Sequence, residues 1–115
     1  MENKNVEEIW EVIDVKLKEN NTVYKDVDAV YRFELTDVED GIYQLKLAEG
    51  SAAVQKNADV KADCILKMKE KYFRRFLAGD LNSTTAFMTG KLKVEGNIGL
   101  ALKLENMLKQ YDFAK

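Results

Sequence analysis

The sequence predicts an α+β domain in which helices cover one face of a five-stranded sheet. Apolar residues recur with a helical period in the first twenty residues and again after residue 69, and they alternate with polar residues in five short segments. Acidic and glycine-containing turns separate the first of these segments, which predicts antiparallel pairing. No linker, repeat or low-complexity tract divides the 115 residues, so we expect residues 1–115 to form a single domain.

The first element is an amphipathic helix that begins near residue 6. Asn5 and Glu8 have the spacing of a capping box, and Asn20 with Asn21 is a plausible end. Its apolar face comprises Val6, Ile9, Trp10, Ile13 and Leu17. This face predicts a helix that packs on the sheet.

Five segments then show the alternation expected of strands with one covered and one wet face. They are residues 30–36, 43–47, 52–55, 62–68 and 91–95. In the second segment Gln44 and Lys46 are expected to face solvent. Cys64 lies in the fourth segment, which favours a buried structural thiol over a nucleophile.

Two short helices are predicted between the fourth and fifth strands, at residues 69–78 and within residues 80–90. Gly79 and Gly90 are suitable stops for them. The first helix groups Tyr72, Phe73, Phe76 and Leu77 on one face. A last helix is expected to begin at Asn97, a good capping residue.

The last helix has more apolar residues than one buried face needs. Its main arc contains Leu100, Ala101, Leu104, Met107, Leu108 and Tyr111. Ile98 and Leu102 lie one turn apart and outside this arc. Packing by the first helix is the interpretation that composition alone favours; a bound apolar molecule or a partner chain would also cover these two residues.

Composition limits the possible functions. Hydrophobic residues make up 46% of the chain and charged residues 33%, which is typical of globular proteins. The net charge of −2 argues against nucleic-acid binding, which needs a basic face. The chain has no histidine and one cysteine, so it lacks the usual general base and the usual metal ligands. We expect no enzyme activity, no cofactor and no metal.

The sequence pattern predicts neither a secretory signal nor a membrane span. The charged, helical first twenty residues do not resemble a secretory signal, and no uncharged apolar run approaches the roughly 18 residues of a membrane span. We therefore expect a cytoplasmic protein in a reducing environment.

Residues 77–108, LAGDLNSTTAFMTGKLKVEGNIGLALKLENML, resemble the C-terminal half of the sterol carrier protein (sterol-transfer) domain. The positions that match the family pattern are Leu77, Gly79, Leu81, Asn82, Ala86, Phe87, Gly90, Lys91, Leu92, Lys93, Val94, Gly96 and Asn97, and the match continues through Leu100, Ala101, Lys103 and Leu104. Two departures are Ser83, where many members have proline, and a chain end without the peroxisomal tripeptide of animal members.

The resemblance implies a mixed, mostly antiparallel five-stranded sheet with an apolar tunnel between the sheet and the helices. It also implies a non-catalytic carrier of sterols, fatty acids, acyl-CoA or phospholipids. By the match, the tunnel residues are Phe87, Leu92, Leu100 and Leu104. Periodicity adds Phe73, Phe76, Leu77, Leu81, Met88 and Leu108. For each of these, core packing without ligand contact is the alternative.

A basic run between residues 67 and 75 is a candidate for membrane docking. Lys71, Arg74 and Arg75 would contact an anionic membrane or acyl-CoA phosphates, although a solvated helix face is the commoner meaning of such a run. The predicted function is lipid binding and transfer. The alternative is a protein-interaction or homodimerisation module that uses the apolar face of the last helix without bound lipid.

Overall fold

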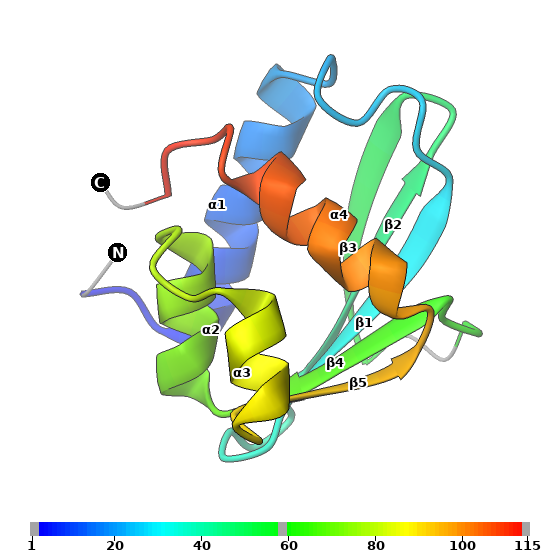
Figure 1. Ribbon diagram of the computed structural model, residues 1–115. Helices are drawn as coiled ribbons and strands as arrows, with labels where there is room; N and C mark the ends of the chain where they lie inside the picture. Colours follow the sequence, from blue (N-terminus) through cyan, green and yellow to red (C-terminus); the bar gives the residue numbers. More distant parts are fainter. Residues whose placement is uncertain (1–2, 58–59, 114–115) are drawn as a thin grey trace.

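The computed structural model describes residues 3–57 and 60–113, which form a five-stranded sheet with four helices on one face (Figure 1). In chain order the elements are α1 (Val6–Glu19), β1 (Ala29–Leu35), β2 (Ile42–Ala48), β3 (Ser51–Lys56), β4 (Cys64–Met68), α2 (Glu70–Leu77), α3 (Ser83–Met88), β5 (Leu92–Gly96) and α4 (Ile98–Leu108). The predicted α+β class and every predicted element are confirmed.

The sheet is mixed, with the strand order β3-β2-β1-β4-β5. Three of its pairings are antiparallel, and β1 pairs with β4 in parallel. The register sets apolar residues side by side, because Phe33 lies opposite Tyr43 on β2 and opposite Leu66 on β4. This alignment produces the one apolar face that the helices cover.

Helix α1 packs over β3, and α4 packs over β4 and β5 (Figure 1). The predicted capping box of α1 is present: the Glu8 N–H donates to Asn5 Oδ1 at 2.9 Å, and the Asn5 N–H donates to Glu8 Oε1 at 3.0 Å. The buried face of α1 consists of the five apolar residues that the sequence predicts. Helix α1 is therefore fixed both by its own end and by its apolar face.

An aromatic cluster joins α1 and α2 to the sheet. The ring of Trp10 stacks on Tyr43 and Phe73, with centroids 5.1 and 5.3 Å apart, and meets Phe33 edge-on at 5.1 Å. Phe76 also lies near Phe33, with ring centroids 6.4 Å apart. Offset and edge-on pairs of this kind add to the stabilisation from burial alone.

The second face of the sheet is partly covered, which the alternation did not predict. Gln44, expected to face solvent, is buried. Its Nε2 donates to the carbonyl oxygen of Val60 at 2.7 Å, and Arg32 Nη2 donates to the same oxygen at 2.9 Å. The expectation for Gln44 was wrong because backbone from outside the strands lies over it, and strand periodicity carries no information about such a cover.

The segment after α4 returns to the end of α1. The Tyr111 hydroxyl donates to the carbonyl oxygen of Asn20 at 2.5 Å, and burial raises the pKa of this hydroxyl to about 12. The ring of Phe113 is buried beside Tyr111, with centroids 5.7 Å apart. The segment that follows α4 is thus joined to the end of α1.

Candidate functional site

A groove of about 160 Å³ lies between α3, α4 and β5. It is lined by Ser83, Thr84, Phe87, Leu92, Val94, Ile98, Ala101 and Leu102, and we call it the apolar groove. Most of its lining is hydrocarbon, and the two hydroxyl residues come from the start of α3. Such a surface favours the apolar part of a ligand over a charged one.

Short caps fix the two helices that border the groove. Asn82 caps α3 by accepting a hydrogen bond from the Thr85 N–H at 3.0 Å. Asn97 caps α4 by accepting one from the Leu100 N–H at 3.3 Å. Both caps are short polar side chains at the position where such residues satisfy free N–H groups.

Gly96 allows α4 to leave β5 at a sharp angle. Its φ of 87° is in the left-handed region, and a Cβ at this position would lie 2.5 Å from the carbonyl oxygen of Asp63. The Asn97 N–H donates to the same oxygen at 3.1 Å. Only glycine fits this approach without a shift of the backbone, so α4 folds back over the sheet and forms one wall of the groove.

Ile98 and Leu102 line the apolar groove and are 49% and 41% exposed. Helix α1 does not cover them, so the interpretation that composition favoured was wrong for these two residues. Their position outside the main arc of α4 correctly separates them from the buried face of this helix, but they form part of an exposed surface and do not pack against a second helix. The groove is open to solvent on their side.

A buried polar contact joins α3 to α4 beside the groove. Glu105 accepts hydrogen bonds from the Ser83 N–H at 2.9 Å and from the Ser83 hydroxyl, and it pairs with Lys109 Nζ at 2.9 Å. Burial alone would raise the pKa of Glu105, but the hydrogen bonds from Ser83 and Lys109 outweigh it and lower the pKa. The carboxylate is therefore held in its charged form.

The residues predicted for the tunnel fall into three groups. Phe87 and Leu92 line the apolar groove. Leu100 is half-buried, and Met88 is strongly exposed at the end of α3. The other six are buried in the core and do not line the groove; they are Phe73, Phe76, Leu77, Leu81, Leu104 and Leu108. Their contact with a ligand stays a prediction, as does the tunnel itself.

Sequence reasoning did not assign the remaining lining residues to the site. These are Ser83, Thr84, Val94, Ile98, Ala101 and Leu102. Helical periodicity singled out Ile98 and Leu102 without saying what they contact. Nothing in the pattern pointed to Ser83 and Thr84, because their place depends on how α3 sits against α4.

The predicted docking residues have different surroundings. Arg74 pairs with Glu70, its Nε 2.8 Å from Oε2, and its Nη2 donates to the Lys4 carbonyl oxygen at 2.6 Å. Arg75 Nε lies 3.6 Å from Asp80 Oδ2. These guanidinium groups are engaged by their own chain, and such contacts reduce their availability to a membrane.

Lys71 is different because its Nζ lies 5.1 Å from the centre of the Tyr72 ring. Among residues 3–57 and 60–113, no carboxylate forms an ion pair with it. Of the three predicted docking residues, Lys71 is the one that contacts an aromatic ring and pairs with no carboxylate of the described residues.

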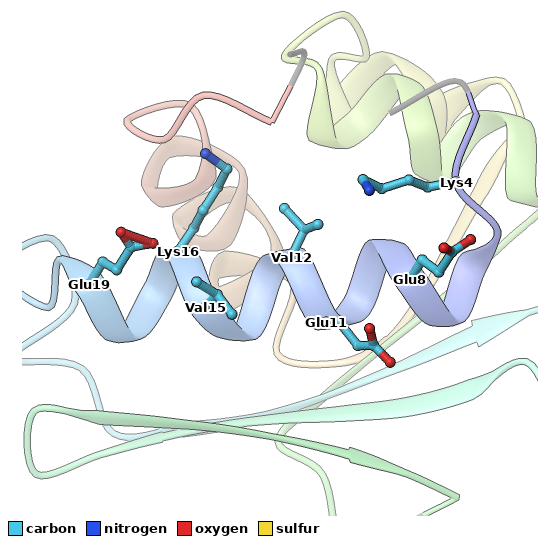
Figure 2. A pocket seen from close by; sticks show the side chains of 7 residues that line it. All are labelled: Lys4, Glu8, Glu11, Val12, Val15, Lys16 and Glu19. Atoms are coloured by element: carbon cyan, nitrogen blue, oxygen red, sulfur yellow. The ribbon is translucent and has the colours of Figure 1, made fainter.

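A second hollow, of about 400 Å³, lies on the outer side of α1. Figure 2 shows its lining residues, which are Lys4, Glu8, Glu11, Val12, Val15, Lys16 and Glu19. In this view Val12 and Lys16 extend from the same side of α1, and the side chain of Lys4, which precedes the helix, reaches toward Val12. Five of the seven lining residues are charged, which is typical of a solvated helix face and unlike the apolar groove.

The part of the chain that the structure describes contains no helix long and apolar enough to cross a membrane. Within the same residues, no three His, Cys, Asp or Glu side chains gather as metal ligands would.

Comparison with known proteins relates this chain to sterol carrier proteins. It is 35% identical over 113 residues to sterol carrier protein 2 of Gallus gallus, a match that covers 93% of this chain and 20% of the relative. It is 36% identical over 106 residues to hydroxysteroid dehydrogenase-like protein 2 of Mus musculus, a match that covers 91% of this chain and 21% of the relative. The chain thus spans about a fifth of the length of these curated relatives.

Solved structures share the fold. Apo sterol carrier protein 2 from Yarrowia lipolytica superimposes with a TM-score of 0.71 at 28% identity, covering 88% of this chain and 87% of that one. Residues 9–109 match the model of the SCP-2 sterol transfer family. Because this match takes in the sheet, the four helices and the apolar groove, we conclude that the chain belongs to the SCP-2 sterol transfer family.

Proposed function

We propose that this chain binds the hydrocarbon part of a lipid in the apolar groove and carries it through water without chemical change. The observation that carries the proposal is the apolar groove itself, a mainly hydrocarbon surface open to solvent on α3 and α4. Each Å² of apolar surface removed from water contributes about 25 cal/mol, so an acyl chain or sterol would gain from entering it. The same surface makes little distinction between one hydrocarbon and another.

A whole lipid needs more space than the groove has. Pockets for small organic ligands usually have at least about 300 Å³, and this groove has about 160 Å³. We infer that the groove widens on binding. Widening between α4 and the sheet would bring the buried residues Leu104 and Leu108 into contact with the ligand, together with Phe87 and Leu92, which line the groove already.

Family membership supports a lipid ligand and gives no support to the alternative of an interaction module without lipid. The fold is also that of the palmitated SCP2L2 from Aedes aegypti, with a TM-score of 0.69 at 19% identity over 91% of this chain and 95% of that one. An acyl chain or a sterol is therefore the ligand class that we propose, and the non-catalytic role is part of the same proposal.

Transient contact with an anionic membrane and a cytoplasmic location complete the proposal. A carrier has to exchange its ligand with a bilayer, and Lys71 is a cation that no carboxylate among the described residues neutralises. The single, fully buried Cys64 suits a reducing compartment, where a thiol needs no partner.

Titration with a fluorescent fatty acid tests the proposal. Ile98→Glu places a carboxylate at the groove and should weaken binding of the probe at least about tenfold, because the charge would lose water when the ligand enters. Position 98 is the first residue of α4, where a negative charge favours the helix, so the variant should fold.

The matched control is Val15→Glu, a similar change at a similarly exposed apolar residue of α1 (56% exposed). It should bind the probe like the wild-type protein. A delipidated, folded wild-type protein that takes up neither fatty acid nor sterol probes would refute the carrier function. Equal affinities of the two variants for the probe would show that the groove is not the binding site.

A further inference from the structure

The apolar groove has an exposed mouth and a buried floor. Ile98 and Leu102, which are 49% and 41% exposed, belong to the mouth. The floor consists of three residues that are almost fully buried: Ser83 (3% exposed), Leu92 (1%) and Ala101 (2%). Ser83 is the polar member of this floor. A few well-placed polar groups in a mainly apolar pocket are what fixes the orientation and the type of the ligand.

Glu105 determines what the Ser83 hydroxyl can do. A serine hydroxyl has one proton to donate and two lone pairs to accept. Its proton is donated to Glu105 Oε1, which also accepts a hydrogen bond from the Ser83 N–H at 2.9 Å. The other carboxylate oxygen, Oε2, pairs with Lys109 Nζ at 2.9 Å. A charged, buried carboxylate is a strong acceptor, so the serine proton is committed to it and Ser83 Oγ is left as an acceptor.

The floor of the groove offers no partner to a negative charge. No lysine or arginine is among the described residues that line the groove, and the nearest charged group on the Ser83 side is the Glu105 carboxylate. The other hydroxyl residue of the lining, Thr84, is exposed. A carboxylate at the floor would lose its water without gaining a cation, which is costly. A fatty acid should therefore enter with its tail first and keep its carboxylate in water at the mouth.

We propose that Ser83 and Glu105 form a site that selects lipids with a hydroxyl group. The ligand O–H donates to Ser83 Oγ, which in turn donates to Glu105, so each proton has one acceptor. An ether or ketone oxygen in the same place would face another acceptor and gain nothing. This inference rests on the proposed lipid-binding function and adds the polar group of the ligand, which a long-chain alcohol or a sterol carries. Ser83 contacts the ligand, and Glu105 is a positioning residue that acts through Ser83.

Displacement of a fluorescent fatty acid by hexadecanol and by hexadecyl methyl ether tests the selection. The ether has the same chain but no hydroxyl proton. For each protein we take the ratio of the two dissociation constants, and comparing this ratio between proteins cancels the different solubilities of the ligands. Ser83→Ala should reduce the preference for the alcohol about threefold to tenfold, the effect of one hydrogen bond. Thr85→Ala, a hydroxyl residue of α3 that does not line the groove, should leave the preference unchanged.

Glu105→Gln is a second variant that keeps the serine. A neutral amide holds the serine proton less firmly than a carboxylate does. Ser83 can then turn and donate to the ether, and the preference for the alcohol should fall at least about twofold. Circular dichroism shows whether each variant folds, and Glu105→Gln decides the case if Ser83→Ala does not. A purely structural role of the two residues would weaken both ligands alike and would not change the ratio.

Cholesterol and its methyl ether form a second pair of ligands. A fall of the ratio in Ser83→Ala for the sterol pair alone would assign the site to sterols, and a fall for the straight-chain pair alone would assign it to fatty alcohols. An unchanged ratio for both pairs in the folded variants would overturn the hydroxyl selection and leave the carrier function intact. A wild-type protein that binds neither the probe nor any of the four lipids would overturn the carrier function itself.

Discussion

The contact between Ser83 and Glu105 offers a quantitative test of how α3 is held against α4. We consider the change Ser83→Ala, which removes the hydroxyl and leaves the backbone N–H bond of 2.9 Å and the 2.9 Å pair with Lys109 in place. Glu105 is only 6% exposed, so water cannot fully replace the lost donor. The variant should fold and should be less stable than the wild-type protein.

The size of the loss follows from the nature of the bond. A hydrogen bond to a charged group contributes about 1.5–3 kcal/mol to the free energy of unfolding. The higher helix propensity of alanine offsets about 0.5 kcal/mol of its loss. The free energy of unfolding should therefore fall by about 1–2.5 kcal/mol at neutral pH. For a domain of this size that corresponds to a melting temperature lower by about 4–10 °C.

The same contact predicts a pH dependence. The pKa of Glu105 is lowered from its ordinary value of 4.5 in the folded protein. The stabilisation is therefore fully present above that ordinary value and is lost as the pH falls through the lower, folded-state pKa. The difference in unfolding free energy between the wild-type protein and Ser83→Ala should narrow as the solution is acidified below this range.

Urea denaturation at neutral and at acidic pH measures both effects. Thr84→Ala is the matched control, since Thr84 is the neighbouring hydroxyl residue of α3 and also borders the groove. Its unfolding free energy should change by no more than about 0.5 kcal/mol. The reasoning fails if Ser83→Ala is as stable as the control, or if its loss of stability is the same at both pH values.

Two other predictions concern buried features of the fold. Gly96→Ala should lower the free energy of unfolding by at least about 2 kcal/mol, because a Cβ at this position would lie 2.5 Å from a backbone oxygen. Gly90→Ala is the control: its φ is similar but no atom lies within 4 Å of the added Cβ, so it should lower the free energy of unfolding by only about 1 kcal/mol. Equal losses of the two variants in thermal denaturation would contradict this reasoning. The Cys64 thiol is fully buried, and burial, aided by the charge of Asp63, raises its pKa to about 11. It should react with Ellman's reagent only after denaturant is added, and immediate reaction of the native protein would count against the burial.

Much of the fold could be predicted because its signals are local. The capping box at Asn5, the apolar face of α1 and the alternation of β1 depend on residues close together in the sequence. The parallel pairing of β1 and β4 has no such signal, since the strands are separated by β2 and β3. The family resemblance implied a mixed sheet, but the sequence did not predict which two strands pair in parallel.

The candidate site was predicted less well because it depends on how separate elements meet. Periodicity identifies Leu104 and Leu108 as apolar and inward-facing, but it does not distinguish a core residue from one that borders a ligand. Ser83 and Thr84 border the groove only because α3 lies against α4. Burial of Gln44 likewise depends on distant backbone at Val60.

The bond between Tyr111 and Asn20 has a consequence for how the protein is made. The ribosome synthesises α1 first, but the carbonyl of Asn20 at its end accepts a hydrogen bond from Tyr111, which is ninety-one residues further along the chain. Until that tyrosine and Phe113 have emerged from the ribosome, the early helix and strands lack part of their final enclosure. A nascent chain stalled before residue 111 should consequently remain sensitive to protease at the end of α1.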